Sequence, residues 1–339
     1  MVGLYVATNG LSVWACDMLG DRISRMPSGT GMYSGSQVWA LATHPKLPGQ
    51  LFAGTDSGIY RLDRARNKWT HLPSPMDDRL VTAIALAPDD PRFMLAGTQP
   101  AGFFQSHDGG ASWRSIAVPV KPYQDSGYYA GENSSAEVSE AVSDVKHWTR
   151  VTQIVFDPRN ARDVWAGVEI DGAWRSRDGG ESWERVSNGL ETQDIHGFAV
   201  VHDGARKLFM TTPVGLHVSS DGGDTWRKLH LDSPWQYTRS VAERPDGTGV
   251  VFVTNGNGPP GSGGRLFRSD NYGRDWHDVQ LPGEVESSAY FIGINPADAN
   301  VVFVAAALGQ IYRSLDGGRN WTALKRRLGE IRAIAWLPD

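Results

Sequence analysis

An eight-residue pattern, Ser-x-Asp-x-Gly-x-x-Trp, recurs along the chain and restricts the folds that the chain can adopt. Ser and Asp side chains satisfy backbone N–H groups inside a turn, Gly supplies a positive φ, and the Trp after the turn buries a large ring. Each copy therefore predicts a hairpin turn with an aromatic anchor, so its Ser and Asp are interpreted as structural rather than catalytic. The copies of this octapeptide are Ser106–Trp113, Ser176–Trp183, Ser219–Trp226, Ser269–Trp276 (with Asn271 in the Asp position), Ser314–Trp321 and a degenerate one, Leu62–Trp69.

The tryptophans that end the octapeptides are spaced by 44, 70, 43, 50 and 45 residues from Trp69 to Trp321. The interval of 70 holds one repeat plus an insertion. A short apolar segment opens each repeat, and seven such openings predict seven units. The openings are Ser36–Pro45, Arg79–Pro88, Arg150–Pro158, Asp194–Asp203, Tyr237–Pro245, Ser288–Pro296 and Glu330–Pro338.

Each unit reads as four short strands joined by turns, which is typical of a propeller blade. We therefore expect an all-β, seven-bladed β-propeller with four-stranded blades, forming a single domain over residues 1–339. The last opening, Glu330–Pro338, lacks the strands that should follow it, whereas the N-terminus begins with a second and a third strand at Gly3–Asn9 and Leu11–Asp17. In the closing blade, the C-terminal segment is thus predicted to supply the inner strand that pairs with the N-terminal strands.

Composition excludes several classes of partner. The net charge is −5 with mixed signs, so there is no basic stripe for nucleic acid and no polybasic or amphipathic segment for a membrane. Cys16 is the single cysteine, which rules out a disulfide framework and a cysteine metal cluster. The start of the chain lacks the basic and apolar regions of a signal peptide, so we expect a cytoplasmic location.

At these octapeptides the chain resembles the BNR or Asp-box repeat propellers, among them sialidases, xyloglucan-degrading glycosidases, sortilin-type receptors and the photosystem II stability/assembly factor. The resemblance implies the fold but no single function, because these proteins have unrelated roles. Sialidases carry Arg-Ile-Pro near the start, and the nearest string in this chain is Asp21-Arg22-Ile23-Ser24. Xyloglucanases use two rings, and this chain has material for one. The overall pattern is most similar to single-ring bacterial proteins described as sialidase-like or glycosyl hydrolase-like.

Insertions are predicted on one rim of the propeller. They are the link at 121–146, the loop at 255–264 and the link at 28–35. A rigid scaffold with variable loops on one side commonly places its site there. The longest insertion contains Tyr123, Tyr128 and Tyr129 and is interpreted either as a lid over the axis or as a plain surface loop.

Polar residues at the start of the inner strands and at the end of the second strands should surround the central opening on this rim. Glu169, Asp171, Asp194 and His196 are the catalytic candidates, because a pair of carboxyl groups with separated pKa values can supply an acid and a base. The alternative is that these carboxylates cap turns and pair with Arg150 or Arg239. The ligand-binding candidates are His147, Trp148, Arg150, Tyr237, Arg239, Glu286, Tyr290 and Arg332.

Arg150, Arg239 and Arg332 would bind a carboxylate or phosphate if their guanidinium groups converge. The alternative is that they form salt bridges between blades with Glu169, Glu286 and Glu330. His147, Glu169 and His196 are candidates for a divalent metal site, but no close-spaced ligand motif supports one. Histidines at strand ends are more often hydrogen-bonded structural residues, so this alternative is preferred to the metal site.

The sequence thus predicts a small polar or anionic ligand, such as a sugar or a carboxylated compound, at the axial opening. Hydrolysis or elimination in the manner of a glycosyl hydrolase-like enzyme is compatible with the candidate residues, and no cofactor is identified. The alternative function is a non-catalytic interaction scaffold in which Tyr123, Tyr128, Tyr129 and Trp148 contact a partner protein, since clustered aromatics suit a protein interface.

Overall fold

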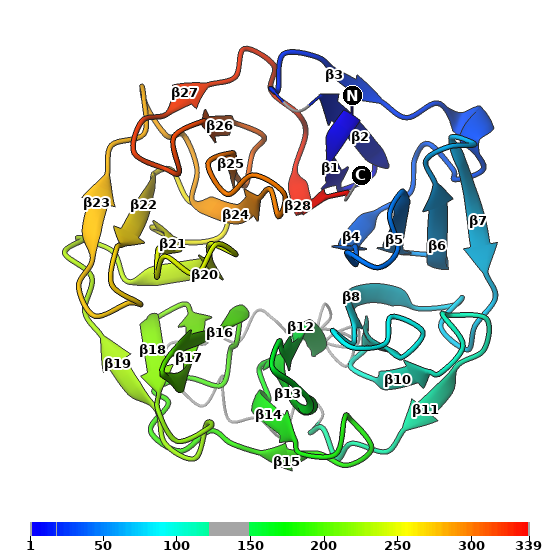
Figure 1. Ribbon diagram of the computed structural model, residues 1–339, viewed down its shortest axis with the longest axis horizontal. Coiled ribbons are helices and arrows are strands. Elements are labelled where there is room, and N and C mark those ends of the chain that lie inside the picture. Colours follow the sequence, from blue (N-terminus) through cyan, green and yellow to red (C-terminus); the bar gives the residue numbers. More distant parts are fainter. Residues whose placement is uncertain (1, 18, 122–148, 338–339) are drawn as a thin grey trace, which may run out of the picture.

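Seven antiparallel sheets of four strands each surround a central axis in the computed structural model, which describes residues 2–17, 19–121 and 149–337 (Figure 1). The prediction of an all-β, seven-bladed propeller with four-stranded blades is confirmed. The chain runs outward through each blade and returns to the axis for the next one. No helix long and apolar enough to cross a membrane occurs among these residues.

In every blade, the inner strand lies at the axis and the fourth strand lies at the outside of the ring. From the axis outward, the strands of the seven blades are β28 (Ile331–Trp336), β1 (Val2–Thr8), β2 (Val13–Asp17) and β3 (Ile23–Arg25); β4 (Val38–Ala42), β5 (Gln50–Thr55), β6 (Gly58–Asp63) and β7 (Lys68–Leu72); β8 (Leu80–Leu86), β9 (Met94–Gln99), β10 (Phe103–Ser106) and β11 (Arg114–Ile116); β12 (Arg150–Asp157), β13 (Asn160–Glu169), β14 (Gly172–Ser176) and β15 (Glu184–Arg185); β16 (Gly197–Asp203), β17 (Ala205–Thr212), β18 (Gly215–Ser219) and β19 (Arg227–Leu229); β20 (Tyr237–Glu243), β21 (Val251–Gly256), β22 (Gly264–Ser269) and β23 (His277–Val279); and β24 (Ala289–Ile294), β25 (Val302–Ala306), β26 (Ile311–Ser314) and β27 (Thr322–Ala323). A 3-10 turn, η1 (Ser28–Thr30), lies in the link before β4.

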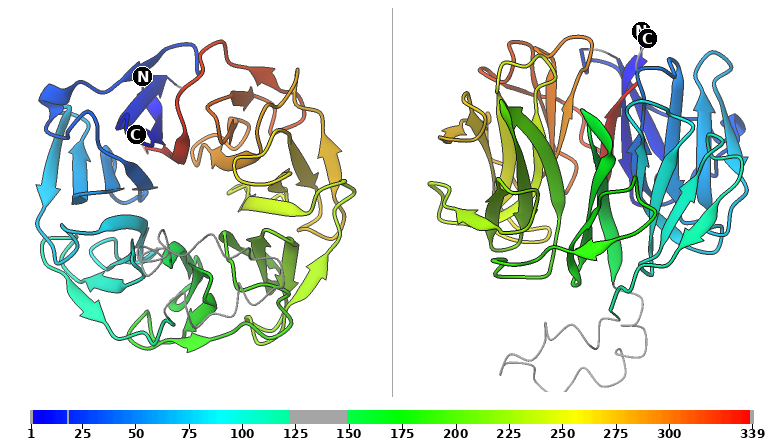
Figure 2. Two further views of the ribbon diagram at one scale, coloured as in Figure 1. Left: turned by 180° about the vertical axis from the view of Figure 1, so that it is seen from behind. Right: turned by 60° about the horizontal axis from the view of Figure 1, so that its bottom comes forward.

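The two ends of the chain meet in one blade, as the sequence predicts. β28 pairs antiparallel with β1, with Leu4 opposite Trp336 and Val6 opposite Ile334 (Figure 2). The backbone N–H of Leu337 also donates to the carbonyl of Gly3 at 2.8 Å. This pairing joins the two ends of the chain in one four-stranded blade and so closes the ring.

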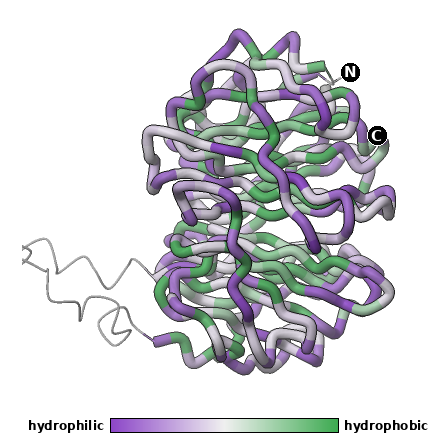
Figure 3. The backbone as a smooth tube through the Cα atoms, turned by 90° about the vertical axis from the view of Figure 1, so that its left-hand side faces the viewer, coloured by the Kyte–Doolittle hydropathy of each residue, from purple (hydrophilic) through white to green (hydrophobic). Residues whose placement is uncertain are grey.

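The hydrophobic core is divided among the spaces between neighbouring blades. Hydrophobic segments follow the strands, whereas hydrophilic segments are frequent along the turns (Figure 3). One core cluster joins Phe209 of β17 to Phe267 of β22, and another joins Trp165 of β13 to Leu208 of β17. Each such fully buried side chain contributes about 2 kcal/mol, so contact between blades stabilises the ring.

The octapeptides form the expected turns. Ser176 donates to Asp178 Oδ1 at 2.7 Å, and its Oγ accepts the backbone N–H of Gly180 at 2.7 Å. Asp178 also accepts the backbone N–H of Ser182 at 2.9 Å. Burial opposes ionisation of Asp178, but the hydrogen bonds from Ser182 and Ser176 lower its pKa to about 2. The Ser176 hydroxyl and the Asp178 carboxylate are both hydrogen-bonded within the turn, so we interpret these residues as structural.

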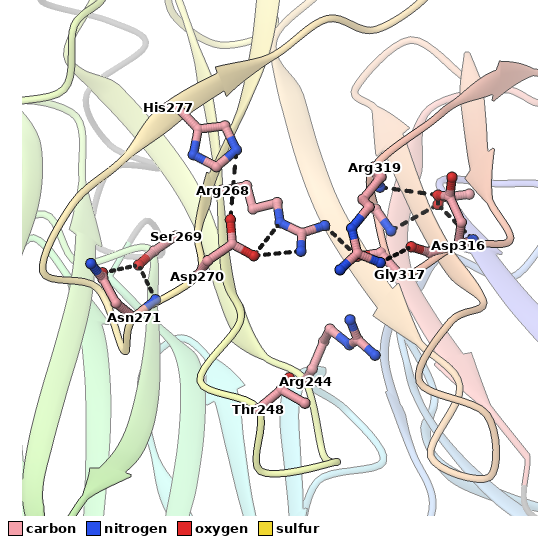
Figure 4. A network of polar contacts seen from close by, with 12 residues as sticks. Arg244, Thr248, Arg268, Ser269, Asp270, Asn271, His277, Asp316, Gly317 and Arg319 are labelled. Atoms are coloured by element: carbon pink, nitrogen blue, oxygen red, sulfur yellow. Dashed lines mark hydrogen bonds and ion pairs between the residues drawn. The ribbon is translucent and has the colours of Figure 1, made fainter.

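Arginines in the third strands connect neighbouring blades just before the octapeptide serines. Arg268 Nη1 donates to the carbonyl of Gly317 in the next blade at 2.6 Å, while its Nε binds Asp270 at 3.0 Å (Figure 4). Arg175 makes the equivalent bond to the carbonyl of Gly222 at 2.9 Å. Both guanidinium groups are almost fully buried. The turns therefore anchor adjacent blades as well as strands within a blade.

Candidate functional site

A cavity of about 230 Å³ lies on the propeller axis, and all seven inner segments contribute to its wall. We call it the axial cavity. Its lining residues lie near the start of the inner strands, on the rim where the sequence places the candidate site. One lining residue from each blade is Trp39, Thr82, Thr152, His196, Arg239, Phe291 and Arg332.

Two arginines of the axial cavity stack on one tryptophan. The Cζ atoms of Arg150 and Arg332 lie 4.8 and 3.9 Å from the centroid of the Trp39 ring. Arg150 forms an ion pair with Glu169, its cross-strand neighbour, and Arg332 forms one with Glu330. Burial lowers the pKa of both arginines despite these carboxylates. The positive charges of Arg150 and Arg332 therefore lie close together in a space with little solvent.

Arg239 differs from the other two arginines because no carboxylate or hydrogen-bond acceptor among the described residues binds its guanidinium group. Its Cζ lies 5.1 Å from the centroid of the Tyr290 ring, and the residue lines the axial cavity. Burial alone would lower the pKa of Arg239, but neighbouring acidic groups, Tyr237 and Glu169 first among them, raise it overall. Among the described residues, the Arg239 charge thus lies at the cavity wall without a direct ion pair, although Glu169 and Asp194 stabilise it at longer range.

Asp194 and His196 form a buried pair beside Arg239. His196 Nε2 lies 3.5 Å from Asp194 Oδ1, and its Nδ1 lies 2.6 Å from the carbonyl of Thr238 on the next inner strand. Burial would raise the pKa of Asp194, but His196 lowers it overall through its charge and a hydrogen bond. Asp194 is therefore ionised at neutral pH, which suits a base or a ligand for a hydroxyl group rather than a proton donor.

Tyr237 and Tyr290 complete the wall behind Arg239. Their hydroxyl groups are 3.2 Å apart, and the Tyr237 ring lies 5.0 Å from the His196 ring. Both residues are buried, and burial raises the pKa of Tyr237. The two rings thus pack against His196 and Arg239 next to the cavity wall.

None of the four candidate carboxylates lines the axial cavity itself. Glu169 and Asp194 contact its wall residues Arg150 and His196, whereas Asp171 and Glu286 bind residues outside the wall. Asp171 follows β13 and turns outward, where its Oδ2 accepts the backbone N–H of Lys121 and its Oδ1 lies 3.7 Å from Arg185 of the outermost strand. Burial raises the pKa of Asp171, but the group is apart from Glu169 and Asp194. Glu286 is exposed and binds Arg327 at 2.6 Å. The expected grouping therefore omits these two carboxylates.

The remaining candidates lie outside the described residues. These are His147 and Trp148, together with Tyr123, Tyr128 and Tyr129 of the insertion. Within the described ranges, no group of three or more His, Cys, Asp or Glu side chains is arranged to hold a metal ion. Glu169 and His196, the metal candidates that are described, instead bind Arg150 and the carbonyl of Thr238.

Trp39, Thr82, Thr152 and Phe291 are cavity residues that the sequence did not single out. Thr82 donates to the carbonyl of Val151 at 2.6 Å and Thr152 to that of Ile195 at 2.8 Å, so both also link successive inner strands. Trp39, Thr82 and Arg332 each stand six positions before the proline that ends their opening. The position of each residue within its repeat could therefore have identified these cavity residues, whereas their charge and polarity alone do not.

Comparisons with known proteins add relatives of known activity. No family model matches the chain. A probable oligoxyloglucan-reducing end-specific xyloglucanase of Neosartorya fischeri is 23% identical over 345 residues, which covers 85% of this chain and 40% of the relative. All four curated relatives that match are xyloglucanases. The chain spans about two fifths of the length of the first of them.

Solved structures are similar in fold. A GH74 enzyme of Niastella koreensis has a TM-score of 0.64 and 20% identity over 85% of this chain and 45% of that one. YCF48 of Cyanidioschyzon merolae has a TM-score of 0.56 and 14% identity, with 85% of each chain covered. At such identities the structures support the seven-bladed propeller, whereas the sequence relatives connect the chain to glycoside hydrolases.

Proposed function

We propose that the axial cavity binds a small carboxylated sugar. The single observation that supports this most strongly is Arg239, a residue of the cavity wall whose guanidinium group forms no direct ion pair or hydrogen bond with a described carboxylate. Guanidinium groups bind carboxylates with two parallel hydrogen bonds, and burial strengthens such contacts. A bound carboxylate would supply the direct ion pair that Arg239 lacks.

The sugar part of the proposal has separate support. The xyloglucanase relatives act on a carbohydrate, as their names state. The axial cavity is also lined by the uncharged hydrogen-bonding groups of Gln153, Ser240, Thr82 and Thr152, which suits a ring that carries hydroxyl groups. Its volume of about 230 Å³ favours a ligand of monosaccharide size over an extended polysaccharide chain.

A direct test is calorimetric titration of the full chain with D-glucuronate and with D-glucose at low ionic strength. We expect measurable binding of glucuronate, at least tenfold weaker binding of glucose, and loss of that preference in Arg239→Gln. Arg227→Gln is the matched control, because Arg227 is exposed on the outermost strand β19. Equal affinities for the two sugars, or an Arg239→Gln variant that keeps the preference, would refute the proposal.

Hydrolysis of a glycosidic bond is the second candidate function, and it is supported by the activity of the curated relatives. Glu169 and Asp194 would be the base-like groups, and they contact the cavity-lining residues Arg150 and His196 without lining the cavity themselves. Inverting and retaining glycosidases also need a carboxyl group that remains protonated. Asp171, whose pKa is raised, lies away from the cavity. For this reason binding has more support than catalysis.

The catalytic candidate is tested by incubating the chain with xyloglucan oligosaccharides and with methyl β-D-glucuronide and measuring new reducing ends. Turnover that is lost in Asp194→Asn but kept in the exposed control Asp298→Asn would support hydrolysis at this cavity. An absence of turnover with intact glucuronate binding would leave the chain as a binding protein.

A further inference from the structure

A second cavity adjoins the axial cavity on the same axis. It has a volume of about 610 Å³, and its lining residues lie at the far ends of the inner strands, including Phe156, Ile294 and Trp336. We call it the apolar chamber. Leu41, Ile84 and Ile154, from three successive blades, line both cavities, so the two spaces are neighbours on this side of the axis.

The chamber contrasts with the axial cavity in chemistry. Among the residues that line it, His44 and Glu243 are the titratable ones, and the others are largely aliphatic, aromatic or proline. His44 Nδ1 accepts the backbone N–H of Lys46 at 3.1 Å, so it is engaged locally. Burial raises the pKa of Glu243 to about 7, which indicates surroundings that disfavour charge. One end of the axis therefore suits an anion, and the other end suits an uncharged apolar group.

We infer that the two cavities form one site for an amphipathic ligand, an acidic sugar that carries an apolar substituent. Its carboxylate binds at Arg239, and its apolar part extends between Leu41, Ile84 and Ile154 into the apolar chamber. This inference rests on the proposed function, and it specifies the ligand class of the same site. An alkyl or aryl glycoside of a uronic acid has this chemistry.

The three lining residues that the two cavities share support a single ligand over two separate ones. An apolar group gains affinity by leaving water, about fourfold for each methylene that becomes buried. A sugar acid alone would leave the apolar chamber filled with solvent and gain nothing from it. A purely apolar molecule would leave Arg239 without a direct ion pair.

The experiment compares three probes by calorimetric titration below their micelle concentrations: methyl β-D-glucuronide, octyl β-D-glucuronide and octyl β-D-glucoside. We expect octyl glucuronide to bind at least a hundredfold more tightly than methyl glucuronide, and at least tenfold more tightly than octyl glucoside. Equal binding of the two glucuronides would overturn this inference and leave the proposed function intact. Equal binding of the two octyl compounds would refute the carboxylate site itself, and an absence of binding by all three would refute both.

Variants locate the apolar part of the ligand. Ile84→Gln adds a polar group where the two cavities meet, and Ala242→Phe fills part of the apolar chamber without burying a polar atom. In both variants, the ratio of octyl to methyl glucuronide affinity should fall at least tenfold. Leu315→Gln is the matched control, since Leu315 is 48% exposed on an octapeptide turn. If each chamber variant melts like the wild type and keeps the full ratio, the octyl group does not occupy the chamber.

Discussion

The Trp39 ring contacts the guanidinium groups of both Arg150 and Arg332, which belong to two other blades. Arg150, Arg332 and Arg239 share one buried space, so the charge of Arg239 disfavours the charged forms of the other two. The aromatic face and the carboxylates of Glu169 and Glu330 offset part of this repulsion. This arrangement explains why an anion entering the axial cavity would be stabilised by more than one cation.

Replacing Trp39 tests the role of this stack. Trp39→Leu removes two cation–π contacts, worth about 0.5–2 kcal/mol each, so glucuronate should bind about tenfold more weakly and the melting temperature should fall. Trp39→Phe keeps an aromatic face and should retain most of the affinity. Calorimetric titration and thermal unfolding measure both effects. Wild-type affinity in Trp39→Leu would show that the stack does not position the arginines.

Arg268→Met tests the connection between blades. Removing the guanidinium group leaves the buried carbonyl of Gly317 without its donor and leaves Asp270 with only its longer contact to His277, at 3.9 Å (Figure 4). We expect the free energy of unfolding to fall by about 2–4 kcal/mol, measured by urea unfolding with tryptophan fluorescence. Arg227→Met, on an exposed strand, should change it by less than about 0.5 kcal/mol. Similar values for the two variants would contradict the anchoring role.

Gly309→Ala tests a tight turn between β25 and β26. Gly309 has φ of +97°, and an added Cβ would lie 1.8 Å from the carbonyl oxygen of Leu328. The backbone must move, so we expect a loss of about 3 kcal/mol or more in thermal or urea unfolding. Gly247→Ala is the control, because Gly247 has φ of +69° with open space around it. The Gly247→Ala variant should lower the free energy of unfolding by about 1 kcal/mol, from backbone strain alone.

The raised pKa of Glu243 predicts that the stability of the protein depends on pH. Its pKa in the folded chain is about 7, above the ordinary value of 4.5, because burial disfavours the ionised form. Stability from this group is present below about pH 4.5 and is lost as the pH rises through 7. Glu243→Gln removes the cost, so the melting temperature of the variant relative to the wild type should be higher at pH 8 than at pH 5. A difference that is constant across this range would contradict the raised pKa.

Much of the fold follows from local patterns in the sequence. The turn chemistry of Ser176, Asp178 and their equivalents depends on neighbours within eight residues, so it is legible without the structure. Counting the openings gives the number of blades, and the isolated opening at the C-terminus predicts the pairing of β28 with β1. These features are determined by short-range hydrogen bonding and by strand alternation.

The candidate site was predictable only in part. Arg150, His196, Arg239 and Arg332 line the axial cavity, because the start of each inner strand faces the axis in a closed ring. The outward position of Asp171 depends on the path of one turn and on contacts with Lys121 and Arg185, which no local pattern encodes. Trp39 was missed because its significance depends on arginines from two other blades.

By itself, the sequence determined a ring of seven four-stranded sheets closed by its own ends, because turns, strand alternation and repeat spacing are local properties. Only the tertiary structure decided which charges are neutralised. Arg150 and Glu169 pair across one hairpin, whereas Arg239 lies at the cavity wall with no such direct partner among the described residues. It also decided that an apolar chamber adjoins that charge, since both spaces exist only where the inner strands of all the blades converge.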